Sequence, residues 1–299
     1  MHRLIRRFVS AGTVAVLVVV WLAGALALGL ATHSSATATV ALMALGLLVG
    51  GVLLIIRHSL DLATRIGNLG TESQRTLGTV RRIESSLGTE LRQTFRQVEA
   101  VQNLNAILPT SEVLPATRGW AASPDLLLVL VDQVITQRPS LIVECGSGAS
   151  TLWLALALRR FGIDGRIVAL DHDPVFAAKT RDFLARHGVS DLAEVRDAPL
   201  EEYSLPNGTY SWYARRAWED LTGIDLLFVD GPPAATGDKA RYPALPLLRE
   251  ALNPAATVVL DDLVVPDMQD TLRLWLDANP EFGSEILPLE KQAALLRKG

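Results

Sequence analysis

The chain has 299 residues, of which 49% are hydrophobic, and its 28 Lys and Arg against 32 Asp and Glu give a net charge of −4. This length allows one large domain, or a medium-sized domain with attached segments. The acidic balance, and arginines that form no basic block in the C-terminal region, argue against a nucleic-acid partner. Cys145 is the single cysteine, so an internal disulfide is excluded.

The N-terminal part is strongly apolar, because residues 8–56 contain no Asp, Glu, Lys or Arg. A bilayer core takes roughly 20 apolar residues as a helix, so this run has room for two membrane spans. The polar stretch "ATHSSATAT" at 31–39 separates them. We therefore expect two transmembrane helices within 11–56, one near 11–31 and one near 38–56.

The flanks of these spans predict their orientation. Basic residues lie before the first span and after the second, whereas the connecting turn carries no Lys or Arg; they are Arg3, Arg6, Arg7, Arg57 and Arg65. The positive-inside rule then places both termini, including the basic segment 1–10, in the cytoplasm of a multi-pass inner (cytoplasmic) membrane protein. A cleaved signal peptide is the alternative, because "MHRLIRRF" is a basic start and "SATA" offers small residues to a peptidase.

Residues 57–107 are polar, with apolar residues spaced three and four apart, which predicts a long amphipathic helix that we call the stalk. Its apolar stripe consists of Leu62, Ile66, Leu69, Leu77, Val80, Ile83, Leu87, Leu91, Phe95 and Val98. So narrow a stripe suits a coiled coil and hence a homodimer. The repeated "LGT" disturbs the heptad, so a solvated linker helix is the alternative.

The segment "LPTSEVLPATRGWAASPDLL" contains three prolines and marks a domain boundary. Ser123, Pro124 and Asp125 fit the start of a helix as cap, first-turn proline and dipole-matched acid. We place the C-terminal domain at 118–299.

Within this domain, strand-like apolar runs alternate with helical segments. That order predicts an α/β fold with a mostly parallel sheet and helices on both faces. The tail "SEILPLEKQAALLRK" predicts two short strands that close one edge, the antiparallel part of the sheet. The predicted strands are 141–145, 166–171, 192–196, 225–230 and 256–261, and the predicted helices are 150–161, 174–187, 242–252 and 267–278.

The stretch "LIVECGSGAST" at 141–151 is an apolar strand that ends in an acid and a glycine loop. In open α/β sheets ligands bind beyond the carboxyl ends of the strands, where glycines let the backbone approach the ligand. A dinucleotide-binding enzyme would have a third glycine where Thr151 stands. A nucleotide-sugar or dinucleotide enzyme on a similar sheet is therefore the less favoured alternative.

The pattern E-x-G-x-G-x-S at 144–150 resembles the first motif of class I S-adenosylmethionine-dependent methyltransferases, and the resemblance extends from residue 118 to residue 299. It implies a Rossmann-like sheet and S-adenosylmethionine as cofactor. A carboxylate at Asp171 can accept both ribose hydroxyls; a helix cap is the alternative, but Asp173 already fits that role. The cofactor-binding residues implied by the resemblance are Glu144, Gly146, Ser147, Gly148, Asp171, His172, Asp197 and Ala198, with the last two at the adenine.

Three carboxylates end the next two strands, Asp230 after "IDLLFV" and Asp261 and Asp262 after "TVVL". They would repel one another unless a cation or a proton lies among them. The arrangement is similar to cation-dependent O-methyltransferases of the catechol and caffeoyl-CoA kind. That similarity implies that the three carboxylates hold a divalent cation such as Mg²⁺, which lowers the pKa of the acceptor hydroxyl.

The sequence departs from that family at Pro233, where the catechol enzymes carry a catalytic lysine. Lys239 and Arg241 are the nearest cations. Without the lysine, Asp230 can act as a direct base in a reaction that needs no metal. The "VDGPP" and "LDD" pattern looks closer still to bacterial macrocin-type O-methyltransferases, whose acceptors vary widely.

We therefore expect a membrane-anchored, S-adenosylmethionine-dependent O-methyltransferase with Asp230 as its catalytic residue, acting on a small-molecule, glycan or lipid-linked acceptor. A membrane scaffold that binds the cofactor without reacting is the alternative. Cys145 fits a small buried residue better than a nucleophile. Trp212 and Tyr213 either cover an acceptor pocket or pack beneath a loop.

Overall fold

The computed structural model describes residues 11–32 and 36–299. The predictions for the basic segment 1–10 and for residues 33–35 of the polar break lie outside the described residues. The chain divides into two compact units, Met1–Gly88 and Thr89–Gly299.

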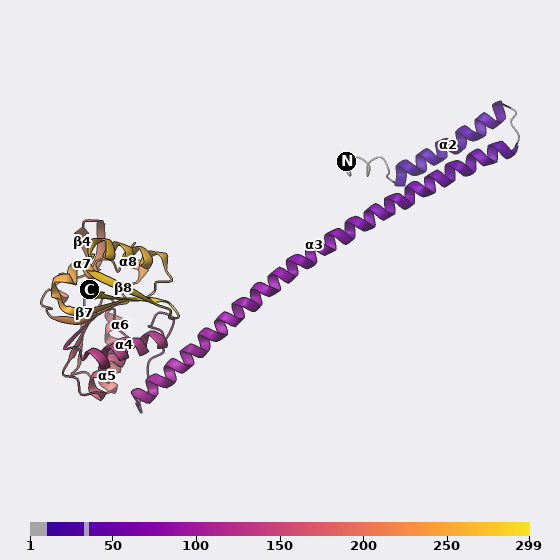
Figure 1. Cartoon of the computed structure of the whole chain (residues 1–299). Coiled ribbons are helices and arrows are strands. Elements are labelled where there is room, and N and C mark those ends of the chain that lie inside the picture. The colour runs from indigo at the N-terminus through magenta and orange to yellow at the C-terminus, as the bar shows by residue number, and fades with distance from the viewer. Residues whose placement is uncertain (1–10, 33–35) are drawn as a thin grey trace. The chain divides into compact units, whose positions relative to one another are not determined.

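The first unit contains helix α2 (Ala11–Ala31) and the beginning of helix α3 (Ala36–Ile107), which are labelled in Figure 1. Both are long and apolar enough to cross a membrane, although a signal sequence has the same character. Trp21 Nε1 on α2 donates a hydrogen bond of 2.9 Å to the carbonyl oxygen of Leu42 on α3. A Cβ atom added to Gly46 would collide with the Trp21 ring, so the small residue permits this close helix packing.

Helix α3 continues without a break through the predicted stalk to Ile107. The ten apolar side chains of the stripe all lie in this helix, and each is between 48% and 65% exposed. The predicted amphipathic helix is therefore present, and its apolar stripe is uncovered in the single chain.

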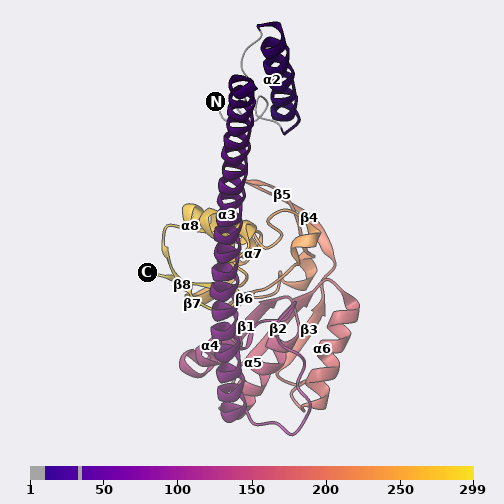
Figure 2. The same cartoon turned by 90° about the vertical axis from the view of Figure 1, so that its right-hand side faces the viewer.

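The second unit is built on a seven-stranded sheet in the order β3-β2-β1-β6-β7-β9-β8. The first five strands in this order are parallel neighbours, and β9 and β8 each run antiparallel to the strand before them. Figure 2 shows β1, β2 and β3 side by side. The strands are β1 (Leu141–Cys145), β2 (Arg166–Asp171), β3 (Ala193–Asp197), β6 (Ile224–Val229), β7 (Leu252–Leu260), β8 (Phe282–Leu287) and β9 (Ala293–Lys298). The prediction of a mostly parallel sheet with an antiparallel edge is confirmed.

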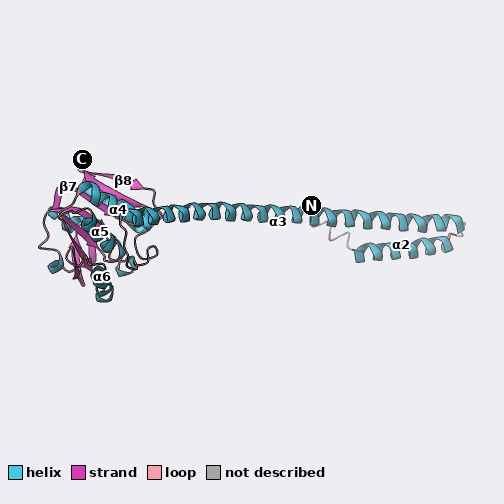
Figure 3. Ribbon diagram, turned by 90° about the horizontal axis from the view of Figure 1, so that it is seen from below, coloured by secondary structure: helices cyan, strands magenta, loops and turns pink. Residues whose placement is uncertain are grey.

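Helices cover both faces of this sheet, as seen in the helix and strand colouring of Figure 3. One core contains residues from α4 (Pro124–Gln137), α5 (Ala149–Arg160) and α6 (Pro174–Arg186). The opposite core contains residues from α7 (Ala244–Leu248) and α8 (Pro266–Ala278). Along β1 the side chain of Ile142 enters the first core and that of Val143 the second. Burial on both faces explains why the strands read as continuous apolar runs.

The helix predicted at 242–252 is wrong in its length. α7 ends at Leu248, and a 3₁₀ turn (Arg249–Ala251) follows it. Strand β7 begins at Leu252, four residues before the predicted start at 256, and it includes Pro254, which cannot continue a helix. The other strands and helices of the sheet layer lie within a residue of their predicted bounds.

A two-stranded hairpin between β3 and β6, formed by β4 (Leu200–Leu205) and β5 (Gly208–Tyr213), was absent from the sequence prediction. The turn letters "PNG" at 206–208 are a recognised hairpin signal that could have revealed it. The hairpin places Trp212 and Tyr213 in the core, where both are 0% exposed.

The end of α3 also belongs to the core of the second unit. Leu104 and Leu108 are 1% and 3% exposed and pack with the residues of α4 and α5. Gln97 Oε1 accepts a hydrogen bond of 3.2 Å from the N–H of Asp125 in the first turn of α4. The hydrophobic core of the second unit therefore includes residues that precede residue 118, where the prolines led us to place the start of the domain.

Candidate active site

The glycine loop lies where β1 ends and α5 begins. Gly146 has φ of +102°, a conformation that favours glycine, and its N–H donates a hydrogen bond of 2.9 Å to the carbonyl oxygen of Leu170 on β2. The ends of β1 and β2 are thereby joined. Ser147 Oγ lies 2.5 Å from Asp171 Oδ2 and donates to it, so the loop also contacts the acid at the end of β2.

Asp171 is 6% exposed, and its second oxygen, Oδ1, accepts a hydrogen bond of 3.0 Å from the N–H of Asp173. Asp173 is the residue that caps α6, because its carboxylate accepts from the N–H of Val175 at 2.8 Å. The capping role is therefore filled by another residue. His172 Nδ1 lies 3.9 Å from Asp171 Oδ1.

The predicted adenine residues lie at the end of β3. Ala198 is 0% exposed, and its N–H donates a hydrogen bond of 2.7 Å to the carbonyl oxygen of Asp171. The Asp197 carboxylate lies 2.8 Å from Arg181 Nη2 on α6 and forms an ion pair with it. This pair was not predicted from the sequence. The contact of Asp197 and Ala198 with an adenine stays a prediction.

Glu144 is completely buried beneath the glycine loop. Among the described residues, neither of its carboxylate oxygens has a hydrogen-bond partner. Burial raises the pKa of Glu144 to about 7; the nearby hydroxyls of Thr151 and Ser150 oppose this rise without forming bonds of normal geometry. An unpartnered carboxyl in such a place is costly, so it points to a bound proton or ligand.

The three carboxylates come together as the strand order requires. β6 and β7 are neighbours, and one oxygen from each of Asp230, Asp261 and Asp262 lies within 4.8 Å of the others. Asp261 is 1% exposed, and its Oδ2 lacks a hydrogen-bond partner among the described residues. Burial raises the pKa of both Asp230 and Asp261.

The cation among these carboxylates comes from the protein itself. Arg241 is 7% exposed, and its Nη2 lies 2.7 Å from Asp262 Oδ2 and 3.1 Å from Asp230 Oδ1. Its Nη1 donates a hydrogen bond of 3.2 Å to the carbonyl oxygen of Asp261. Lys291 Nζ lies 3.4 Å from Asp262 Oδ1. We call these three acids and two cations the acid–base cluster.

Sequence reasoning named Arg241 only as a nearby cation and missed Lys291. Lys291 stands in the connection between β8 and β9, 29 residues from Asp262 along the chain, and no motif marks it. The carboxylates are close enough to share one ion, but the guanidinium of Arg241 already binds one oxygen each of Asp230 and Asp262, and Lys291 lies beside the other oxygen of Asp262. The residues present therefore do not fit a resident divalent cation.

Three other predicted features have structural roles. Burial raises the pKa of the Cys145 thiol, and the residue is 0% exposed, which agrees with a small core residue. Trp212 and Tyr213 pack in the core; Tyr213 lies under the loop after β6, since a Cβ atom on Gly231 would meet its hydroxyl oxygen at 2.5 Å.

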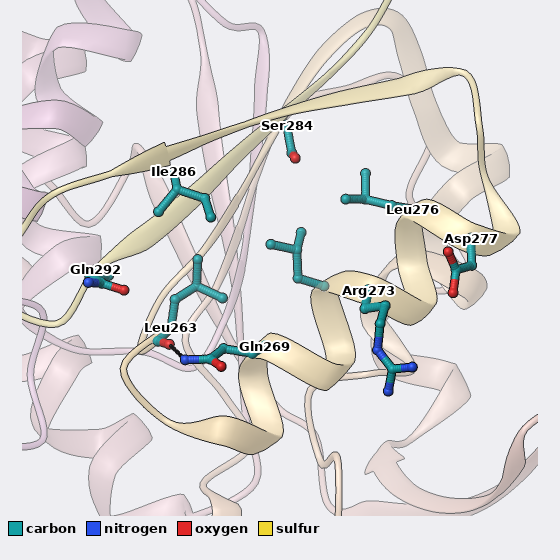
Figure 4. A pocket seen from close by; sticks show the side chains of 9 residues that line it. Leu263, Gln269, Arg273, Leu276, Asp277, Ser284, Ile286 and Gln292 are labelled. Carbon is teal, nitrogen blue, oxygen red and sulfur yellow. Dashed lines mark hydrogen bonds between the residues drawn. The ribbon is translucent and has the colours of Figure 1, made fainter.

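A groove of 440 Å³ lies between α8 and β8 (Figure 4). Gln269 Nε2 donates a hydrogen bond of 2.8 Å to the carbonyl oxygen of Leu263 at one side of it. The residues that line this groove include none of those predicted for the site.

Three solved structures are among those similar to this chain. A methyltransferase from Podospora anserina with bound SAH has 17% identity, covers 68% of this chain and 87% of its own, and has a TM-score of 0.48. An O-methyltransferase from Streptomyces achromogenes involved in tomaymycin synthesis, in complex with SAM, has 18% identity, 68% and 88% coverage and a TM-score of 0.46. An O-methyltransferase from Bacillus cereus in complex with SAH has 22% identity, 68% and 90% coverage and a TM-score of 0.44.

A search of the curated proteins found no match. Residues 143–263 match a family model described as a methyltransferase domain. The matched segment includes the glycine loop, Asp171 and all three carboxylates of the acid–base cluster. The match supports the presence of a methyltransferase domain in the second unit of this chain.

Proposed function

We propose that the second unit transfers a methyl group from S-adenosylmethionine to an oxygen of its acceptor, and that the first unit anchors it to the cytoplasmic membrane. One observation carries the proposal. The segment that matches a methyltransferase domain contains a glycine loop in direct contact with a buried acid, Asp171, at the carboxyl end of the next strand.

The glycine loop and Asp171 have the chemistry for a nucleoside with a free ribose. The Asp171 carboxylate can accept two hydroxyl donors, and the hydroxyl of Ser147 now occupies one of these positions. Gly146 has no side chain to obstruct an approaching ligand. Glu144 lies buried in β1 directly before this loop, and among the described residues its carboxylate oxygens have no hydrogen-bond partner.

Asp230 is the residue that we assign to proton transfer. When bound, the cofactor supplies an electrophilic methyl group, so the protein's own task is to position the acceptor and remove its proton. Asp230 ends β6 beside the glycine loop, since its N–H donates a hydrogen bond of 3.0 Å to the carbonyl oxygen of Cys145. Burial raises the pKa of this carboxyl and so makes it a stronger base.

The apolar helices of the first unit support the anchor. α2 and the start of α3 each have the length and composition of a membrane span, and Trp21 joins them. An anchored enzyme suits an acceptor that is itself held at the membrane, such as a lipid-linked or glycan intermediate; a small molecule is the other class. The exposed stripe of α3 supports a homodimer formed through the stalk.

The proposal is tested with the full chain in detergent. Calorimetric titration should show binding of S-adenosylmethionine and S-adenosylhomocysteine, whereas NAD should not bind. Binding of NAD alone would favour a dinucleotide enzyme. Comparison of the lipids and glycans of a deletion strain with those of the parent, by mass spectrometry, then identifies the acceptor as the species whose mass falls by one methylene group for each site. Cofactor binding with no methylated product would favour the scaffold.

A further inference from the structure

Within the acid–base cluster, one arginine side chain bridges two of the three carboxylates. One nitrogen of Arg241, Nη2, contacts a carboxylate oxygen of Asp230 at 3.1 Å and one of Asp262 at 2.7 Å. A single positively charged atom thus links the end of β6 to the end of β7. A divalent cation with carboxylate ligands would make the same link.

We propose that Arg241 takes the place of a divalent cation in this site, so that the cluster excludes Mg²⁺ and Mn²⁺. The exclusion concerns the cluster alone. It does not depend on the methyltransferase function proposed above.

Competition for the same oxygens supports the exclusion. A hard cation binds carboxylate oxygens at about 2.0–2.6 Å and competes for their lone pairs with the donors already bound there. Here Asp262 has a cation on each oxygen, Arg241 on Oδ2 and Lys291 on Oδ1. A divalent ion among these groups would lie beside two fixed positive charges, and the low polarity around a buried guanidinium strengthens that repulsion.

The segment that carries Arg241 is firmly held, so the guanidinium cannot easily withdraw. The N–H of Lys239 donates a hydrogen bond of 2.8 Å to Asp267 Oδ2 at the start of α8. Trp275 Nε1, also on α8, donates one of 2.8 Å to the carbonyl oxygen of Tyr242. Arg241 lies between these two anchor points, with its Nη1 bound to the backbone of Asp261.

Manganese binding is the direct test, because it requires neither cofactor nor acceptor. The full-length wild-type protein in detergent, treated with chelator and titrated with Mn²⁺, should leave the electron paramagnetic resonance signal of free Mn²⁺ unchanged. Arg241→Met keeps an apolar stem and removes the charge, so it should gain one bound ion per chain. Arg241→Lys, which restores a positive charge, should lose that binding again.

Arg249→Met is the matched control, since Arg249 forms an exposed ion pair with Glu281 outside the cluster. It should behave as the wild type does. Saturable binding of one Mn²⁺ by the wild-type protein, abolished by Asp261→Asn, would overturn the proposal even if Arg241→Met does not fold. Calorimetry with S-adenosylmethionine on the same samples reports separately on the methyltransferase function.

Discussion

Polar side chains at the ends of β1 and β2 bind one another where a cofactor is expected. Ser147 Oγ contacts both Asp171 Oδ2 and, at 3.0 Å, Thr180 Oγ1 on α6. A ligand with vicinal hydroxyls can exchange for the serine without leaving the acid unpaired. The sequence predicted the place of Asp171 because the end of a strand is visible in an apolar run, but it could not predict the serine as its present partner.

Asp171→Ala is expected to weaken S-adenosylmethionine binding by about 2 to 4 kcal/mol, because two hydrogen bonds to a charged acceptor are lost. Calorimetric titration of the full chain measures the change. Asp182→Ala removes a carboxylate from α6 that pairs with Arg186 in solvent, and it should leave the affinity unchanged. Equal affinities of the wild type and Asp171→Ala would remove this residue from the site.

Glu144 should make stability depend on pH. Burial raises its pKa from 4.5 to about 7, so the folded protein holds the proton more tightly than the unfolded chain. The resulting stabilisation is complete below pH 4.5 and is lost as the pH rises through 7, up to about 3 kcal/mol. Glu144→Gln should lack this pH-dependent contribution to the free energy of unfolding. Denaturant titrations of the wild type and the variant at several pH values would measure the difference. Parallel pH dependences would contradict the prediction.

Pairings between segments distant in the chain were the least predictable part of the site. Arg181 reaches Asp197 from α6, and Arg241 reaches the acids from the loop after β6. The sequence required some positive charge near Asp230, Asp261 and Asp262, since three carboxylates cannot approach one another alone. Which residue supplies it depends on loop conformation, and apolar periodicity carries no information on that.

The helices and strands were most predictable where both faces of a segment are buried. β1 and β2 lie at their predicted residues, since a continuous apolar run between breakers leaves few alternatives. α7 and the β4–β5 hairpin were not predictable in the same way. These segments are short, with five residues in α7 and six in each hairpin strand, so no apolar period is long enough to identify them, and a 3₁₀ turn leads from α7 to β7 at Leu252.

The last turns of α3 should contribute to the stability of the second unit. Leu104→Ala removes a side chain that is 1% exposed and should lower the free energy of unfolding by about 2 to 5 kcal/mol. Gln102→Ala, on the same helix at an exposed position outside the apolar stripe, should change it by less than about 0.5 kcal/mol. Denaturant unfolding followed by tryptophan fluorescence compares the two. Similar effects would mean that the helix end does not belong to the core.

The side chains of the first unit and of the second unit differ in how far they are exposed. In the first, apolar side chains such as Val16, Leu48 and Ile55 are more than half exposed. In the second, two hydrophobic cores enclose apolar side chains on the two faces of the sheet. Composition alone predicted this division, because a charge-free run of this length has no place on a protein surface in water.

For the entire chain we predict two membrane spans with both termini in the cytoplasm. Because basic residues flank both spans, a reporter active only in the cytoplasm should function when fused at either end of the full chain. The protein should stay in the membrane pellet after alkaline washing and leave it in detergent. A purified protein whose N-terminus begins beyond the first apolar helix would show cleavage of a signal peptide instead. In that case the second unit of the protein would lie outside the cytoplasm.

The buried position of Cys145 has a practical consequence. The chain has one cysteine, and it is sealed inside the sheet with a pKa that burial raises, so thiol reagents have nothing to attack in the native protein. The natural protein can therefore serve, without removal of its cysteine, as the unlabelled parent for site-directed spin labelling. A single cysteine introduced at an exposed stalk position such as Leu77 or Leu87 would carry the only nitroxide in each chain. The spin–spin distance across two copies would then reveal whether the stalks associate and in which register.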